Sequence, residues 1–131
     1  MRPWINGIHY TVDQVEFLPR PVDPRGIPIW IAGFPGKIRP RRRAARHEGF
    51  FPVNITHPDE LAEAVDAVTT LRAAELEEAA AEDYDVAVAL EPGTDPGAFV
   101  RAGATWCLTE TDPDKLRLAD IRAMVADGSF R

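Results

Sequence analysis

The sequence predicts an α/β fold: a parallel sheet of about four βα units over residues 27–131, within a single domain covering residues 1–131. Short apolar runs alternate along the chain with segments of helical pattern, and this alternation implies right-handed crossovers between parallel strands. The apolar runs are nearly continuous rather than strictly alternating, as expected for strands covered on both faces. Residues 1–26 do not share this pattern and are predicted to be an irregular lead-in.

The first two strands are predicted on either side of a basic segment. Residues 27–32 form the first apolar run. A short helix over about residues 40–47 follows, and Gly49 is its expected C-terminal cap. Residues 50–53 form the second strand.

The second helix has a well-marked start. Thr56 or His57 is the expected cap, and Pro58 falls in the first turn, where its missing N–H costs nothing. Asp59 and Glu60 follow, where the helix dipole favours negative charge. One apolar face is predicted from residues at helical spacing, namely Leu61, Val65, Val68 and Leu71.

The last two units repeat the alternation. Residues 84–90 form the third strand, and residues 75–83 before it leave the end of the second helix open. A short helix is expected from Asp95 and Pro96 to Gly103, before a fourth strand over residues 104–108. The signals of a last helix are Asp112 and Pro113 before it, Leu118, Ile121 and Val125 within it, and Gly128 after it.

The lead-in has its own local pattern. Residues 9–17 alternate between apolar and polar side chains, which predicts an irregular strand or a hairpin outside the main sheet. Three prolines then favour an extended connector, at Pro19, Pro21 and Pro24.

The number of units points to a larger architecture. Four βα units are half of an eight-unit barrel of roughly 250 residues. A four-stranded parallel sheet alone would leave two unpaired edges and one uncovered apolar face. We therefore expect half of a parallel (β/α)8 TIM-type barrel, completed by a missing N-terminal barrel half or by a homodimer partner.

Composition excludes several classes of protein. The net charge of −6 argues against a surface that embraces nucleic acid or an anionic membrane, so we expect neither as a partner. No apolar run approaches the roughly 18 residues of a membrane-spanning helix, and the N-terminus has no apolar signal region, which predicts a cytoplasmic protein. Cys107 is the single cysteine, so we expect neither an intrachain disulfide nor a metal site.

Several segments, in order, resemble one family. Ile-Pro-Ile-Trp-Ile-Ala-Gly at residues 27–33 is followed by Arg-Arg-Ala-Ala-Arg-His-Glu-Gly-Phe-Phe-Pro-Val at residues 42–53. These segments resemble the second half of luciferase-like monooxygenases and related flavin- or deazaflavin-dependent oxidoreductases. The resemblance extends to Gly-Ile-His-Tyr-Thr-Val at residues 7–12, Phe-Leu-Pro-Arg-Pro at residues 17–21 and Ala-Gly-Ala-Thr-Trp at residues 102–106.

The resemblance implies a fold, a cofactor and a chemistry. The family fold is an eight-stranded β/α barrel, often dimeric, with a flavin across the C-terminal ends of its strands. The implied cofactor is FMN or a deazaflavin, and the implied reaction is hydride transfer to, or oxygenation of, a small organic substrate. The flavin-ring platform and most substrate contacts come from the first half of the barrel, so no catalytic residue is assigned to this chain.

The resemblance also names a phosphate site. In the family, the cofactor phosphate is held by loops after two consecutive strands, which correspond here to Gly33 and Phe34, and to Asn54, Ile55 and Thr56. Many relatives have two adjacent glycines where this chain has Gly33-Phe34. From the residues alone, the loop at 33–36 is either a backbone cradle for phosphate or a turn that needs glycine for its dihedral angles.

Other candidate residues have two explanations each. Thr56 either binds phosphate or only caps the helix; for His57 the cap is favoured, and for His9-Tyr10 packing and function weigh equally. Core packing is expected for Trp30, Trp106 and Cys107, which lie in strands. Three carboxylates that follow the third and fourth strands are expected to line the mouth of the barrel, namely Glu91, Glu110 and Asp112.

A dense basic cluster precedes the second strand, formed by Lys37, Arg39, Arg41, Arg42, Arg43 and Arg46. No stacking aromatics interleave with these residues, and the following helix is acidic. A solvated outer helix face is therefore favoured over a nucleic-acid site. For the whole chain, the alternative to part of an enzyme is a non-catalytic remnant that acts as a self-associating interaction protein.

Overall fold

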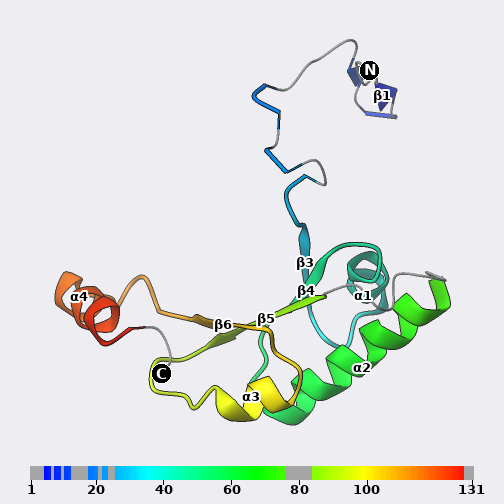
Figure 1. Ribbon diagram of the computed structural model, residues 1–131. Helices are drawn as coiled ribbons and strands as arrows, with labels where there is room; N and C mark the ends of the chain where they lie inside the picture. The colour runs from blue at the N-terminus through cyan, green and yellow to red at the C-terminus, as the bar shows by residue number, and fades with distance from the viewer. Residues whose placement is uncertain are drawn as a thin grey trace.

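The computed structural model of the chain describes residues 5–6, 8–9, 11–12, 18–20, 22–23, 26–75 and 84–128 (Figure 1). Its main sheet contains four parallel strands in the order β3-β4-β5-β6: β3 (Trp30–Gly33), β4 (Gly49–Pro52), β5 (Asp85–Leu90) and β6 (Trp106–Thr109). Each strand is followed by a helix: α1 (Ile38–Ala44), α2 (Pro58–Glu75), α3 (Gly97–Arg101) and α4 (Leu118–Asp127). The predicted α/β alternation and parallel sheet are confirmed.

The lead-in contains a separate small sheet. β1 (Ile5–Asn6) pairs antiparallel with β2 (Thr11–Val12), so a hairpin lies outside the main sheet, as predicted, but it begins before residue 9. Residues 13–17, where the prediction continued, lie outside the described residues.

The two faces of the main sheet differ in how they are covered. Figure 1 shows α1, α2 and α3 gathered on one side of the sheet, with α4 apart from them beyond the end of β6. Strand alternation directs one set of side chains toward these helices, and that set is buried: Ile31, Phe50, Val86, Val88 and Leu90. The opposite set forms what we call the open face: Trp30, Ala32, Gly49, Phe51, Asp85, Ala87, Ala89, Trp106 and Leu108.

The helix-covered face holds two packed clusters. Around Phe50, one cluster joins β3 and β4 to α1 and α2 through Ile31, Ala44, Ala45, Ala64 and Val68. Around Val88, the other joins β5 to α2 and α3 through Ile55, Leu61, Val86, Leu90, Phe99 and Ala104. Leu61 and Val68 are fully buried and Val65 and Leu71 partly buried, which confirms the predicted apolar face of the second helix.

A buried arginine links α2 to the end of α1. Arg72 of α2 donates to the carbonyl oxygens of Ala45 (3.3 Å) and His47 (3.0 Å), and its guanidinium lies 4.2 Å from the ring centroid of Tyr84. The Tyr84 hydroxyl in turn donates to the Ala44 carbonyl. The free carbonyls at the end of α1 are thereby satisfied by side chains rather than by a glycine cap.

Some predicted boundaries are wrong. Gly49 is not a helix cap: α1 ends with Ala45 as its cap, and Gly49 is the first residue of β4. The first strand begins at Trp30 instead of residue 27, and Ile27 and Ile29 are exposed. The Ile29 N–H donates to the Glu48 carboxylate rather than to a strand. Gly103 follows α3 with a φ of +107°, as its predicted role requires.

No helix in the described part of the chain is both long and apolar enough to cross a membrane.

Candidate functional site

Two predicted loops meet at the carboxyl-terminal edge of the sheet. Gly33 and Pro52 are register partners at the ends of the parallel strands β3 and β4. The Val53 N–H donates to the Gly33 carbonyl at 3.1 Å, so the strands stay joined where the loops begin. Phe34 follows one strand and Asn54 follows the other, which brings the two segments side by side.

The start of α2 gathers three donors on one oxygen. The Thr56 N–H, the Thr56 hydroxyl and the His57 N–H donate to Oε2 of Glu60, at 2.9, 3.0 and 3.1 Å. These hydrogen bonds, led by that of the Thr56 N–H, lower the pKa of Glu60 from its ordinary value. Thr56 thus donates its hydroxyl to Glu60 instead of capping α2 with it. Glu60 was missed as a site residue, although glutamate three residues after a helix cap is a known signal.

Asn54 and Ile55 have different roles in their loop. Asn54 is exposed and has a φ of +60°, a left-handed conformation that asparagine tolerates better than most residues. Ile55 is buried in the cluster around Val88, so its side chain belongs to the core and only its backbone is available to a ligand. Ile55 therefore anchors the loop that presents Asn54 and Thr56.

Gly33 is needed for close packing. A Cβ atom built there would overlap the ring of Pro40 in α1, and neither Gly33 nor Gly36 has a positive φ. The explanation that this turn needs glycine for its dihedral angles is therefore wrong. Phe34 is about half exposed (54%), and its carbonyl accepts the Lys37 N–H at 3.0 Å. Glycine at position 33 thus lets α1 approach β3.

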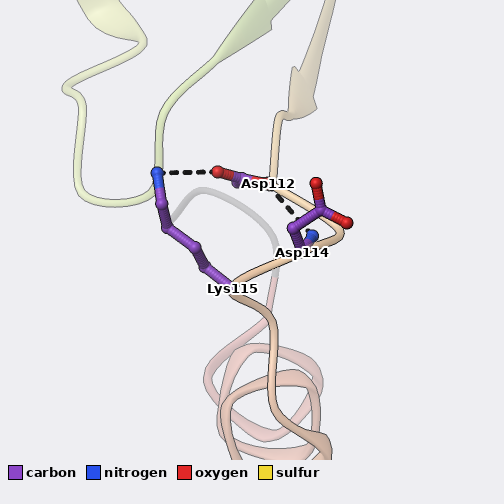
Figure 2. Close-up of polar contacts among 3 residues, drawn as sticks. All are labelled: Asp112, Asp114 and Lys115. Atoms are coloured by element: carbon purple, nitrogen blue, oxygen red, sulfur yellow. Dashed lines mark hydrogen bonds and ion pairs between the residues drawn. The ribbon is translucent and has the colours of Figure 1, made fainter.

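A second group of candidates lies at the ends of β5 and β6. Glu91, Glu110 and Asp112 line one cleft of about 820 Å³ together with Lys115 and residues of α4. Figure 2 shows Lys115 reaching Asp112, with 2.7 Å between Nζ and Oδ2, while the Asp114 N–H donates to Oδ1 at 3.0 Å. The ion pair with Lys115, followed by the Asp114 N–H, lowers the pKa of Asp112, which suits a fixed anion and not a proton donor.

The basic cluster is largely solvated, as predicted. Arg39, Arg42 and Arg43 of α1 are exposed. Arg41 is mostly covered and lies 3.6 Å from the carboxylate of Glu63 in α2.

Two tryptophans and one aspartate interact on the open face. The indole N–H groups of Trp30 and Trp106 donate to the two oxygens of Asp85, at 3.1 and 3.0 Å, and the two rings lie 5.6 Å apart. The prediction that Trp106 packs in a core is wrong for the single chain, because half of its surface is exposed. Cys107 points to the helix-covered face and packs against the cluster around Val88, and burial raises the pKa of its thiol.

The His9-Tyr10 candidate belongs to the lead-in. His9 is exposed between β1 and β2, and Tyr10 lies outside the described residues. In the described ranges, no three histidine, cysteine, aspartate or glutamate side chains come together as a metal site. Comparison with protein-family models, curated proteins and solved structures finds no match.

Proposed function

We propose that this chain is the C-terminal half of a luciferase-like (β/α)8 barrel and holds the phosphate end of FMN or a deazaflavin. The observation that carries the proposal is the adjacency of two loops, Gly33-Phe34 and residues 54–56, at the ends of register-paired parallel strands. This edge is where β/α barrels build their sites.

The donors at the start of α2 suit a phosphate oxygen. Thr56 and His57 already direct three donors at one carboxylate oxygen of Glu60. A phosphate oxygen has the same preference for N–H and O–H donors at a helix N-terminus. The Glu60 side chain is exposed, so it can turn outward and leave these donors to the ligand.

The chain's share of the reaction is binding and orientation. A bound flavin or deazaflavin supplies the hydride-transfer or oxygenation chemistry. Residues 54–56 and the start of α2 hold the phosphate, which fixes one end of the cofactor along the strand ends. The cleft beside Glu91, Glu110 and Asp112 offers a polar wall to a small organic substrate at the same edge.

The test is an FMN titration of the full chain, followed by flavin fluorescence. Thr56→Val removes one hydroxyl donor and is expected to weaken FMN binding by about 10- to 100-fold, the value of one hydrogen bond to a charged group. Glu60→Gln removes the competing carboxylate charge and is expected to strengthen binding. Asp59→Asn is the matched control, because Asp59 is another first-turn acid and makes none of the three hydrogen bonds to Thr56 and His57.

Riboflavin, which lacks the phosphate, separates the phosphate from the ring. Neither Thr56→Val nor Glu60→Gln should change its affinity. Equal affinities for FMN and riboflavin, or no saturable binding of FMN or a phosphorylated deazaflavin, would overturn the proposal.

The second candidate is a non-catalytic protein that acts only by self-association. The open face favours it, because Ala32, Trp106 and Leu108 are exposed there, as does α4, which has no buried residue. This candidate predicts association of the chain without saturable flavin binding, whereas the first predicts flavin binding with or without association.

A further inference from the structure

Exposed apolar side chains gather at the two outer strands of the sheet. On the β3 side, the exposed large hydrophobic residues are Ile27, Ile29, Phe34 and Ile38. On the β6 side they are Trp106, Leu108, Leu118, Ile121 and Val125. In the described ranges 26–75 and 84–128, the exposed large hydrophobic residue away from these two sides is Val100 of α3. The exposed apolar surface of this part of the chain therefore lies mainly at the two edges of one sheet.

The helix α4 has no pair of neighbouring strands to pack against. α1 packs over both β3 and the next strand, β4. A helix placed likewise after β6 needs a further strand beside β6, but β6 is the last strand in the described sheet. α4 has no buried residue, and its apolar residues Leu118, Ile121 and Val125 recur at helical spacing.

The charged group on the open face already has hydrogen-bond partners within the chain. Asp85 is the charged residue among its described members, and each of its two oxygens accepts an indole N–H from Trp30 or Trp106. A partner that covers this face leaves both hydrogen bonds in place, which offsets part of the cost of removing the carboxylate from water. Apart from Asp85, the described members of this face are nonpolar, so a second copy presents a mainly apolar surface to it.

The two edges carry opposite charge. Residues 37–46, beside β3, contain Lys37 and five arginines and no acid. Residues 110–127, beside β6, contain five acids, Glu110, Asp112, Asp114, Asp120 and Asp127, against the three bases Lys115, Arg117 and Arg122. The basic edge of one chain thus complements the acidic edge of another chain of the same sequence.

We propose that a second copy of this chain docks on these edges, with β3 of each copy parallel to β6 of the other. A two-fold axis along the strands then closes eight parallel strands into one barrel, and each α4 covers the seam between its own β6 and the partner's β3. The inference rests on the half-barrel part of the proposed function and not on cofactor binding.

The available apolar area suits a dimer. On the order of 50 Å² of apolar surface remains exposed on each of these side chains. The nine residues at the two edges thus offer roughly 450 Å² per copy. That is more than half of the roughly 800 Å² per partner of a standard interface, before the open face and the strand backbones are added.

The first test is the mass of the full chain in solution, by sedimentation equilibrium at several concentrations. The expected result is a dimer of twice 14.5 kDa. Leu108→Lys and Val125→Lys each place an unpaired charge in the seam and should weaken the dimer by at least about tenfold. Val100→Lys is the control and should leave the dimer unchanged, because Val100 lies on α3, away from both edges, and its exposed fraction is between those of Leu108 and Val125.

A charge exchange tests the pairing of edges. One chain carries four changes at exposed bases, Lys37→Glu, Arg39→Glu, Arg42→Glu and Arg43→Glu, which leave residues 37–46 with four acids and two bases. The other carries Asp114→Lys and Asp127→Lys, which leave residues 110–127 with three acids and five bases. Each variant alone should be monomeric, since two acidic or two basic edges then meet, while their mixture should form a one-to-one dimer. The proposed geometry therefore predicts association in the mixture and in neither variant alone.

Several results would overturn the inference. A chain that stays monomeric up to about 100 µM, well above a typical transient affinity, takes a different partner on these edges. Self-association that survives the charge exchange, or that Val100→Lys weakens as much as Leu108→Lys, would mean another interface. FMN titration of the same samples separates the two proposals. A monomer that binds FMN would refute only the proposed dimer, and a dimer that does not bind FMN would refute only the proposed cofactor site.

Discussion

Gly49 is a position where one added methyl group is expected to be costly, because atoms of two other strands lie close to its Cα atom. A Cβ atom there would lie 2.5 Å from Cδ1 of Trp30 and 2.8 Å from the carbonyl oxygen of Asp85. Neither neighbour yields easily: the indole is held by its hydrogen bond to Asp85, and the carbonyl belongs to the backbone of β5. Gly49→Ala therefore forces β3, β4 and β5 apart, with an expected loss of about 1–3 kcal/mol in the free energy of unfolding, typical of overpacking.

Urea unfolding followed by tryptophan fluorescence measures this loss directly, because the strained contact involves Trp30. The measurement is made at one fixed protein concentration, since association makes apparent stability depend on concentration. Gly36→Ala is the control: its Cβ would meet nothing within 4 Å and its φ is not positive, so a change within about 0.5 kcal/mol is expected. A loss at Gly49 no larger than at Gly36 would refute the argument from close approach.

Three further results are expected. Leu61→Ala, at a fully buried site, should lower the free energy of unfolding by about 2–5 kcal/mol, while Val100→Ala, at an exposed site, should change it by less than about 0.5 kcal/mol in the same urea titration. Because its pKa is lowered on folding, the Glu60 carboxylate stabilises the fold above its ordinary value of 4.5 and loses this effect as pH falls through the lowered pKa. The stability difference from Glu60→Gln should therefore vanish in acid. Burial raises the pKa of Tyr84 to about 12, so its contribution holds below the ordinary value of 10 and fades as pH rises through the folded value. Absorbance titration of a Tyr10→Phe chain should show one phenolate forming near pH 12, and a midpoint near 10 would contradict the burial.

The order of the elements could be predicted because each apolar run and each helical pattern is a local signal. The boundaries could not, since register depends on residues distant in sequence. Residues 27–32 look like one strand by composition, but pairing starts where Trp30 meets Gly49. Pro28 lacks an N–H and the Ile29 N–H donates to Glu48, so the first half of the run stays outside the sheet.

The role of Gly49 also depends on residues that are distant in sequence. A glycine shortly after a basic helix is a usual sign of a C-terminal cap, and that local sign predicts the wrong role here. The actual reason for glycine is the approach of an indole and a carbonyl from two other strands. The end of α1 is instead closed by Arg72 and Tyr84, which lie far along the chain and carry no local signal of that role.

The candidate site was predictable where it follows from topology. Loops after consecutive parallel strands must meet at one edge, so the adjacency of Phe34 and Asn54 could be expected without coordinates. Which donors are already engaged could not be expected from topology, because this depends on a rotamer of Glu60. The sequence thus predicts the candidate segment, and the structure shows that Glu60 already accepts its donors.

The half-exposed Trp106 connects the sequence to the proposed dimer. Its strand has the composition of a buried element, yet the single chain leaves half of this side chain and much of Leu108 in water. The same is true of α4, whose apolar spacing is that of a packed helix although none of its residues is buried. Elements on the other side of the sheet show no such mismatch, since Phe50, Val88 and Leu61 are buried as their patterns predict. This difference between predicted and observed burial, at the outer strands and α4, coincides with the surface on which we propose that a second copy docks.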